Sequence, residues 1–159
     1  MKTKFLLFPL IILLFSCKKD ESPDTKMPFI ADPGSVYISN EGNFQSGNAS
    51  ITCFNPSNGT SNTDAFKYVN NLPLGDICQS MNIINGKLFA VVNNSGKIEV
   101  CDPYSMLKTS TITGLTSPRY IISAGTLKAY VSDTYSNHIS IINLNDNSIS
   151  GTIAMNGLT

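Results

Sequence analysis

The sequence has little of what metal and catalytic sites are usually built from. It contains one histidine, His138, and no tryptophan, and no two of its four cysteines form a CxxC pair. This shortage argues against a zinc site and against a nucleophile–base pair or triad. No glycine-flanked serine lies at a strand-to-helix turn either. We therefore expect a protein that is not an enzyme, with no metal and no cofactor.

Charge and paired cysteine are also scarce. Only 14% of the residues are charged, and eleven basic residues balance eleven acidic ones, so nucleic acid is not an expected partner. Without Cys17, three cysteines remain, namely Cys53, Cys78 and Cys101, and an odd number cannot form a complete disulfide framework. Cys53 and Cys101 lie in apolar runs, where free cysteine commonly behaves as a small buried residue.

A helical period is missing after residue 30, whereas Asn, Ser, Thr and Gly are plentiful, so the pattern predicts an all-β fold. Residues 128–153 repeat the pattern of residues 87–112 at a constant offset of 41. Phe89 pairs with Tyr130 and Val100 with Ile141 in this repeat. A period of about 40 residues made of short strands is typical of β-propeller blades.

A looser copy begins at Val36. Residues 36–39 match 88–91 at an offset of 52, and residues 51–56 match 98–103 at an offset of 47. The first copy therefore carries a loop that is five residues longer, at 40–50. Insertions of this kind lie on one face of a repeat protein, often the binding face.

Within the second copy, residues 87–92 and 97–101 read as strands joined by a turn at 93–96, and residues 107–112 read as the outer strand. We expect about three four-stranded blades at 34–159, from a ring of about seven or eight blades. Such a ring needs roughly 280 to 330 residues, which favours a truncated chain. Assembly from several chains is the alternative.

The first seventeen residues have the form of a secretory signal. Two lysines precede an apolar core at 5–15, which is too short to span a membrane. The run Leu14-Phe15-Ser16-Cys17 resembles a bacterial lipobox, so we expect lipidation of Cys17. An ordinary signal peptide with an incidental cysteine is the alternative.

Residues 18–33 are expected to be a disordered tether, since 18–26 is charged, contains a proline and lacks apolar residues. Lys19-Asp20-Glu21 resembles the surface-export signal of Bacteroidetes lipoproteins. This places the chain, anchored only by lipid, on the outer face of the outer membrane, with the inner face as the alternative.

Several motifs resemble a known family. Residues 36–44 and 47–51, Pro73-Leu74-Gly75-Asp76, residues 93–100 and residues 114–120 are similar to Bacteroidetes surface lipoproteins with a YncE-like/DUF5074 β-propeller. The resemblance covers about residues 34–155. BtuG-type members capture cobalamin and pass it to a TonB-dependent transporter, so the resemblance implies nutrient capture. Other members bind other ligands or serve as scaffolds.

Candidate binding residues lie in two loop series, the first turns of the blades and the crossovers into each blade. A corrin-like ligand suits amide donors beside aromatic rings. The candidates are Asn40, Glu41, Phe44, Asp76, Gln79, Asn94, Arg119, Tyr120, Asp133 and Tyr135.

Simpler roles compete with these assignments. Asn and Asp in turns often bond their own backbone, which applies to Asn93 and Asn94. Arg119 can pair with Asp76 near the channel, and His138 is expected to be solvated. Two other functions stay open: an envelope scaffold, and a propeller lactonase, for which Asp76 and Asp133 supply too few carboxylates.

Overall fold

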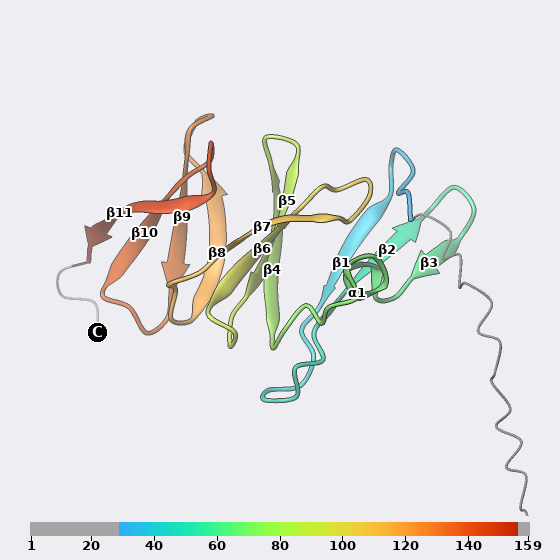
Figure 1. The fold of residues 1–159 in the computed structure, drawn as a ribbon, viewed down its shortest axis with the longest axis horizontal. Coiled ribbons are helices and arrows are strands. Elements are labelled where there is room, and N and C mark those ends of the chain that lie inside the picture. The colour runs from blue at the N-terminus through green and yellow to red at the C-terminus, as the bar shows by residue number, and fades with distance from the viewer. Residues whose placement is uncertain (1–28, 156–159) are drawn as a thin grey trace, which may run out of the picture.

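The computed structural model describes residues 29–155, which form three antiparallel sheets in chain order (Figure 1). The first sheet contains β1 (Val36–Asn40), β2 (Ser50–Asn55) and β3 (Thr60–Asn62). The second contains β4 (Cys78–Ile84), β5 (Lys87–Val92), β6 (Lys97–Cys101) and β7 (Lys108–Ile112). The third contains β8 (Pro118–Ser123), β9 (Lys128–Asp133), β10 (His138–Asn143) and β11 (Ser148–Ala154).

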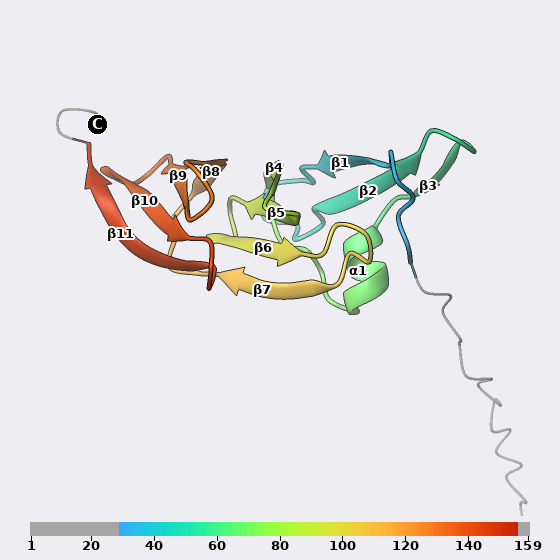
Figure 2. The same ribbon diagram turned by 90° about the horizontal axis from the view of Figure 1, so that it is seen from above.

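The predicted repeat is confirmed by the strand register. Phe89 lies opposite Val100 in the second sheet, and Tyr130 lies opposite Ile141 in the third, as the offset of 41 requires. Figure 2 shows β1, β4 and β8 along one side of the molecule, with β7 and β11 along the other. Each sheet is thus one blade, and the all-β propeller architecture holds.

The first blade differs from the predicted four strands, because in the described residues its sheet has three. β1 is equivalent to β5, so the position that β4 and β8 occupy in their own sheets has no strand beside β1. The chain before β1 runs elsewhere: the backbone N–H of Ala31 donates to the carbonyl of Tyr104, at 2.7 Å. Ala31 is buried there, so the end of the expected tether at 29–33 packs on the second blade.

A short helix, α1 (Ala65–Asn70), lies in the crossover from β3 to β4 and was not expected from the sequence. The Asp64 side chain caps its first turn by accepting from the N–H of Lys67, and Phe66 on its inner side is fully buried. Six residues are fewer than two turns, so no helical period was available to detect it.

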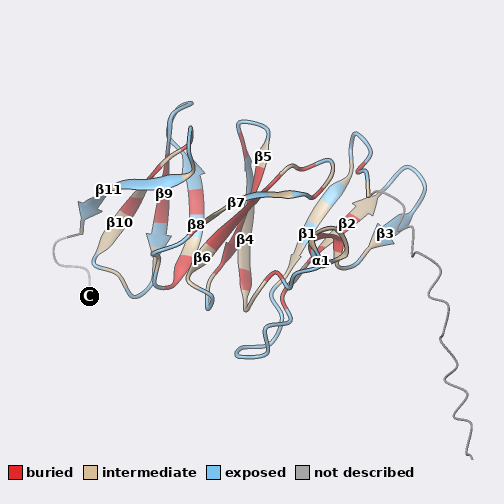
Figure 3. Cartoon of the chain, viewed as in Figure 1, coloured by how far each residue is buried: buried red, intermediate tan, exposed pale blue. Residues whose placement is uncertain are grey.

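The core has two parts, each between neighbouring sheets (Figure 3). Ile51, Leu88 and Ala90 belong to the part between the first and second blades. Phe89, Val100 and Val131 belong to the part between the second and third blades. Burying each large apolar side chain contributes about 1.5–3 kcal/mol relative to leaving it exposed. Within 29–155 no helix is long and apolar enough to cross a membrane.

The cysteines at 53, 78 and 101 are free thiols inside this core, as predicted for Cys53 and Cys101. Burial raises the pKa of Cys78 to about 12 and that of Cys101 to about 12. The thiolate is the reactive form, so these two thiols are chemically quiet near neutral pH.

We expect Cys78 and Cys101 to resist iodoacetamide at pH 8 in the native chain and to react after denaturation. Folded-state pKa values above the ordinary value of 9.0 also mean that their contribution to stability is complete below pH 9 and falls as the pH rises toward 12. Mass spectrometry of the Cys78 and Cys101 peptides measures the labelling. Equal labelling of native and denatured chains would contradict the prediction.

Candidate functional site at the loop end of the blades

Both predicted loop series lie at the same end of the sheets. Val92 at the end of β5 pairs with Cys78 at the start of β4, and Asp133 at the end of β9 pairs with Pro118 at the start of β8. Each crossover therefore meets the first turn of the blade that it enters. The name loop end is used below for residues 40–49, 75–80, 93–96, 114–120 and 133–137.

The longer first loop reaches over to the second blade. The carbonyl of Glu41 accepts from the N–H of Cys78 at 3.2 Å, and the N–H of Ala49 donates to the carbonyl of Gly75 at 3.1 Å. At its tip, the N–H of Gln45 donates to Oδ2 of Asp76 at 2.8 Å. The neighbouring residue Phe44 is 65% exposed.

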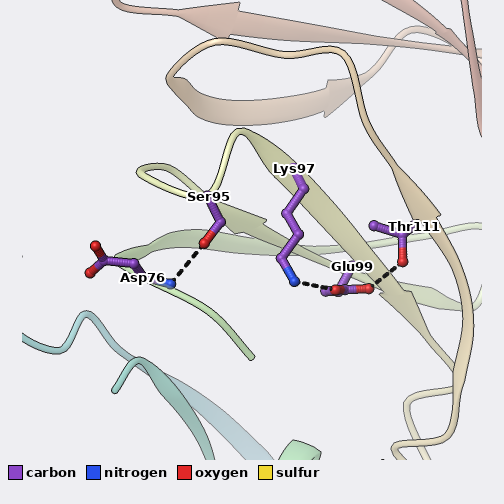
Figure 4. A network of polar contacts seen from close by, with 5 residues as sticks. All are labelled: Asp76, Ser95, Lys97, Glu99 and Thr111. Atoms are coloured by element: carbon purple, nitrogen blue, oxygen red, sulfur yellow. Dashed lines mark hydrogen bonds and ion pairs between the residues drawn. The ribbon is translucent and has the colours of Figure 1, made fainter. Parts of the chain in front are cut away.

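Asp76 ties three segments together. Its N–H donates to Oγ of Ser95 at 2.9 Å (Figure 4), and its Oδ2 also accepts from the amide of Asn94 at 2.5 Å. Gly75 permits this approach: at its φ of +136° a side chain is strained, and an added Cβ would lie 2.7 Å from Ser95 Oγ. Asp76 and Asn94 therefore hold the loops in place, and Oδ1 of Asp76 is buried without a hydrogen-bond partner.

Asn40 and Asp133 also serve the scaffold. Asp133 accepts from the backbone N–H groups of Thr116 at 2.8 Å and Ser117 at 2.9 Å, which fixes the crossover into the third blade. The amide of Asn40 donates to Oγ of Ser50 and to Oγ1 of Thr52, at 3.0 and 2.9 Å. Asp133 also accepts from the N–H of Tyr135 in its own turn, at 3.2 Å. The turn-forming alternative is wrong for Asn93 and Asn94, whose amides donate to Ser117 and Asp76 in other segments.

Arg119 bonds Gln79 rather than the expected Asp76. Its Nη1 donates to the Gln79 side-chain carbonyl, which links the innermost strands of the second and third blades. In the part of the chain that the structure describes, no carboxylate forms an ion pair with Arg119. Because an amide does not neutralise the guanidinium, its positive charge is available to a ligand.

Three aromatic rings at the loop end are largely exposed. Phe44 comes from the first blade, while Tyr120 and Tyr135 come from the third and are 61% and 80% exposed. Large exposed rings have little role in stability, but they can stack on a flat ligand. With Gln79 and Arg119 they are the candidate residues of the loop end, and Glu41 adds an exposed carboxylate on the first loop.

Sequence reasoning missed a buried charge. The alternation of β6 places Ile98 and Val100 on one side and Lys97 and Glu99 on the other, yet Glu99 is buried. Lys97 Nζ lies 2.6 Å from Glu99 Oε1, and Thr111 Oγ1 donates to Glu99 Oε2 at 2.6 Å (Figure 4). His138, the residue equivalent to Lys97, is half-buried, with Nδ1 2.8 Å from Ser136 Oγ.

Two cavities lie away from the loop end. One of about 460 Å³ is lined by residues that include Asp64, Lys67 and Asn71 beside α1. Another of about 290 Å³ is lined by residues that include Ala31, Ser35 and Cys53. Neither of these two cavities is lined by a candidate binding residue.

Lys97→Met should destabilise the chain by about 2–3 kcal/mol, because it leaves the buried carboxylate of Glu99 without its cation. Adding Glu99→Leu should recover part of this loss, since the uncompensated charge is then removed. Urea denaturation of the chain, its two single variants and the double variant gives the coupling free energy. Strictly additive losses would show that the pair does not interact.

The chain matches a family model described as "Domain of unknown function (DUF5074)" over residues 34–158. Among solved structures it is similar to hydrazine synthase of Kuenenia stuttgartiensis, with a TM-score of 0.61 and 18% identity over 88% of this chain and 39% of that one. A nidogen/laminin complex gives a TM-score of 0.58 and 17% identity over 78% and 45% of the two chains. The RRP9 WD40 repeats give 0.58 and 16% over 76% and 35%.

These likenesses show the fold, and the described chain spans less than half the length of each of the three structures. No curated protein matched with significance.

Proposed function

Since the chain belongs to the DUF5074 family of domains of unknown function and has a propeller fold, we propose that it is a binding module without catalytic activity. Its ligand is a nutrient with a flat apolar face and amide substituents, with a corrinoid such as cobalamin as the specific candidate. The observation that supports this proposal is the set of exposed rings at the loop end, which also carries the Arg119 guanidinium; among the described residues the bond of this group is to the Gln79 amide.

Each group at the loop end has a role in this proposal. Phe44, Tyr120 and Tyr135 stack on or flank the apolar face of the ligand. Gln79 and Arg119 supply hydrogen-bond donors for amide oxygens, and the Gln79 carbonyl is an acceptor. Asp76, Asn94 and Asp133 hold the loops rigid, which lowers the entropy that binding costs.

The proposal also includes a cellular location, which rests on the sequence before the first blade. Residues 1–17, with lipidation at Cys17, and residues 18–28 lie outside the described residues. In our proposal they anchor the module by lipid to the outer membrane, facing the exterior. From there it hands its ligand to a TonB-dependent transporter.

A scaffold that contacts other envelope proteins is the second candidate. Phe44 and Tyr135 favour it, because protruding rings are also common anchors in protein interfaces. Capture of a TonB-dependent transporter that is unaffected by added corrinoid supports the scaffold. Capture that strengthens with corrinoid supports the nutrient-binding role.

Tyr120→Ala should weaken cyanocobalamin binding by about tenfold, because an aromatic contact contributes about 0.5–1.5 kcal/mol. Tyr104→Ala is the matched control: Tyr104 is 59% exposed, against 61% for Tyr120, and it lies in the β6–β7 turn at the opposite end. Calorimetric titration of the full chain measures both affinities. If cyanocobalamin produced no heat and no spectral change with the unmodified chain, the corrinoid proposal would be contradicted.

A further inference from the structure

The end of the blades opposite the loop end also exposes apolar side chains. The name turn end is used below for residues 29–35, 56–59, 85–87, 102–108, 124–128 and 144–148. In Figure 1 the β4–β5 and β8–β9 turns project at the top, whereas the first loop, 40–49, projects at the bottom. Four large apolar residues of the turn end are between 54% and 71% exposed, namely Ile30, Tyr104, Leu107 and Leu127.

The segment before β1 is fixed at the turn end. Ala31 is buried, and its N–H donates to the carbonyl of Tyr104 at 2.7 Å. The hydroxyl of Tyr37 donates to the carbonyl of Pro103 in the same β6–β7 turn. Ile30 therefore lies beside this turn, and the polypeptide enters the first blade from the turn end.

The other turns at this end belong to the same surface. Gly86 and Pro103 line one cavity of about 310 Å³, so the β4–β5 and β6–β7 turns meet there. The amide of Asn85 donates to the carbonyl of Thr126 at 2.7 Å, which ties the β4–β5 turn to the β8–β9 turn that carries Leu127. Scattered exposed apolar residues are ordinary on a protein surface. Here they lie on turns that contact one another, and they are presented at one end of the blades.

The charged groups of the turn end suit a layer of phospholipid headgroups. Asp102 and Asp146 accept from backbone N–H groups of their own turns, at 2.7 Å from Ser105 and 3.1 Å from Ser148. Three lysines of the turn end form no ion pair with the described residues, namely Lys87, Lys108 and Lys128. A lysine stem can lie along apolar surface while its ammonium group bonds a phosphate oxygen.

We propose that the turn end rests on the phospholipid headgroups of the membrane that holds the chain, with its four exposed apolar residues at the boundary of the acyl chains. This inference rests on the anchor at Cys17 in the proposed function. Eleven residues lie between Cys17 and Phe29, and they span at most roughly 40 Å when fully extended. A connection of this length keeps the turn end at a high effective concentration near the bilayer, so a weak contact is sufficient. The loop end then faces away from the membrane and is open to ligands.

Because the sequence has no tryptophan, a single introduced tryptophan can report on either end of the blades. The full chain is reconstituted in vesicles of phosphatidylethanolamine and phosphatidylglycerol, where the lipid on Cys17 or the apolar segment 5–15 holds it. Leu107→Trp should lose about half of its emission to brominated acyl chains, since apolar groups at the interface lie roughly 5–10 Å deep. Tyr135→Trp at the loop end is the matched control, and soluble iodide should quench its emission instead.

A second substitution tests whether the turn end itself makes the contact. Leu127→Asp in the Leu107→Trp chain should lower the ratio of docked to undocked module by at least about tenfold, because it replaces a buried apolar contact by a charge. Leu72→Asp is the control: Leu72 is 46% exposed but lies in the crossover from α1 to β4, so quenching should not change. Quenching by brominated acyl chains measures both ratios.

The outcomes separate this inference from the proposed function. Intact mass of the chain purified from cells shows whether Cys17 carries lipid, and a missing lipid contradicts the proposed anchor while quenching still tests the turn end. The inference is overturned if brominated acyl chains leave the emission of Leu107→Trp unchanged, or if they quench Tyr135→Trp equally. A chain that does not sediment with the vesicles overturns it as well.

Discussion

Face-to-face packing of one sheet on the next is the contact on which the rest of this chain depends. The second blade is covered on both sides, and from Leu88 to Val92 every residue of β5 is buried. A strand buried on both faces needs a continuous apolar run rather than alternation, and Lys87–Val92 reads KLFAVV. The first and third blades are each covered on one side by the described chain, and Val36, Ile38, Ile122 and Ile153 are exposed on them.

This packing also determines where polar chemistry can occur. Antiparallel blades in series bring each crossover against the first turn of the blade that it enters, and the backbone groups there need partners. Asp133 at the end of β9 accepts from Thr116 at such a junction, whereas Asp76 in the crossover accepts from the N–H of Gln45 in the loop of the preceding blade. Both carboxylate oxygens of Asp133 are satisfied in this way, whereas Oδ1 of Asp76 is buried without a hydrogen-bond partner. In the proposed function, ligand binding falls to Arg119, Gln79 and the exposed rings.

The repeat in the sequence was enough to predict most of the fold. An ungapped offset of 41 predicts β5–β7 and β9–β11 nearly to the residue, since each strand must pair with its neighbour in the same register in both copies. It also predicts that the two loop series share one end. The repeat could not predict where a blade departs from the pattern. The helix α1 is too short to show a period, and the residues before β1 bond Tyr104 of the second blade through Ala31 instead of pairing with β1.

The candidate site was less predictable, because residue type does not reveal which hydrogen bonds are already taken. Asn40 and Asp133 have the same chemistry as ligand-binding residues, and their contacts within the fold distinguish them. Glu99 is the opposite case. The alternation of β6 predicts an exposed side chain, but the side chain is buried and its carboxylate is paired with Lys97 and Thr111. In a repeat protein, each residue can be compared with the residue at the equivalent position of another blade. Ser80 and Asn82 of the second blade bond the next blade, whereas their equivalents in the third blade, Tyr120 and Ile122, are exposed apolar residues. Specific information therefore lies at the positions where equivalent residues differ, and in this chain they lie at the inner edge and the loop end.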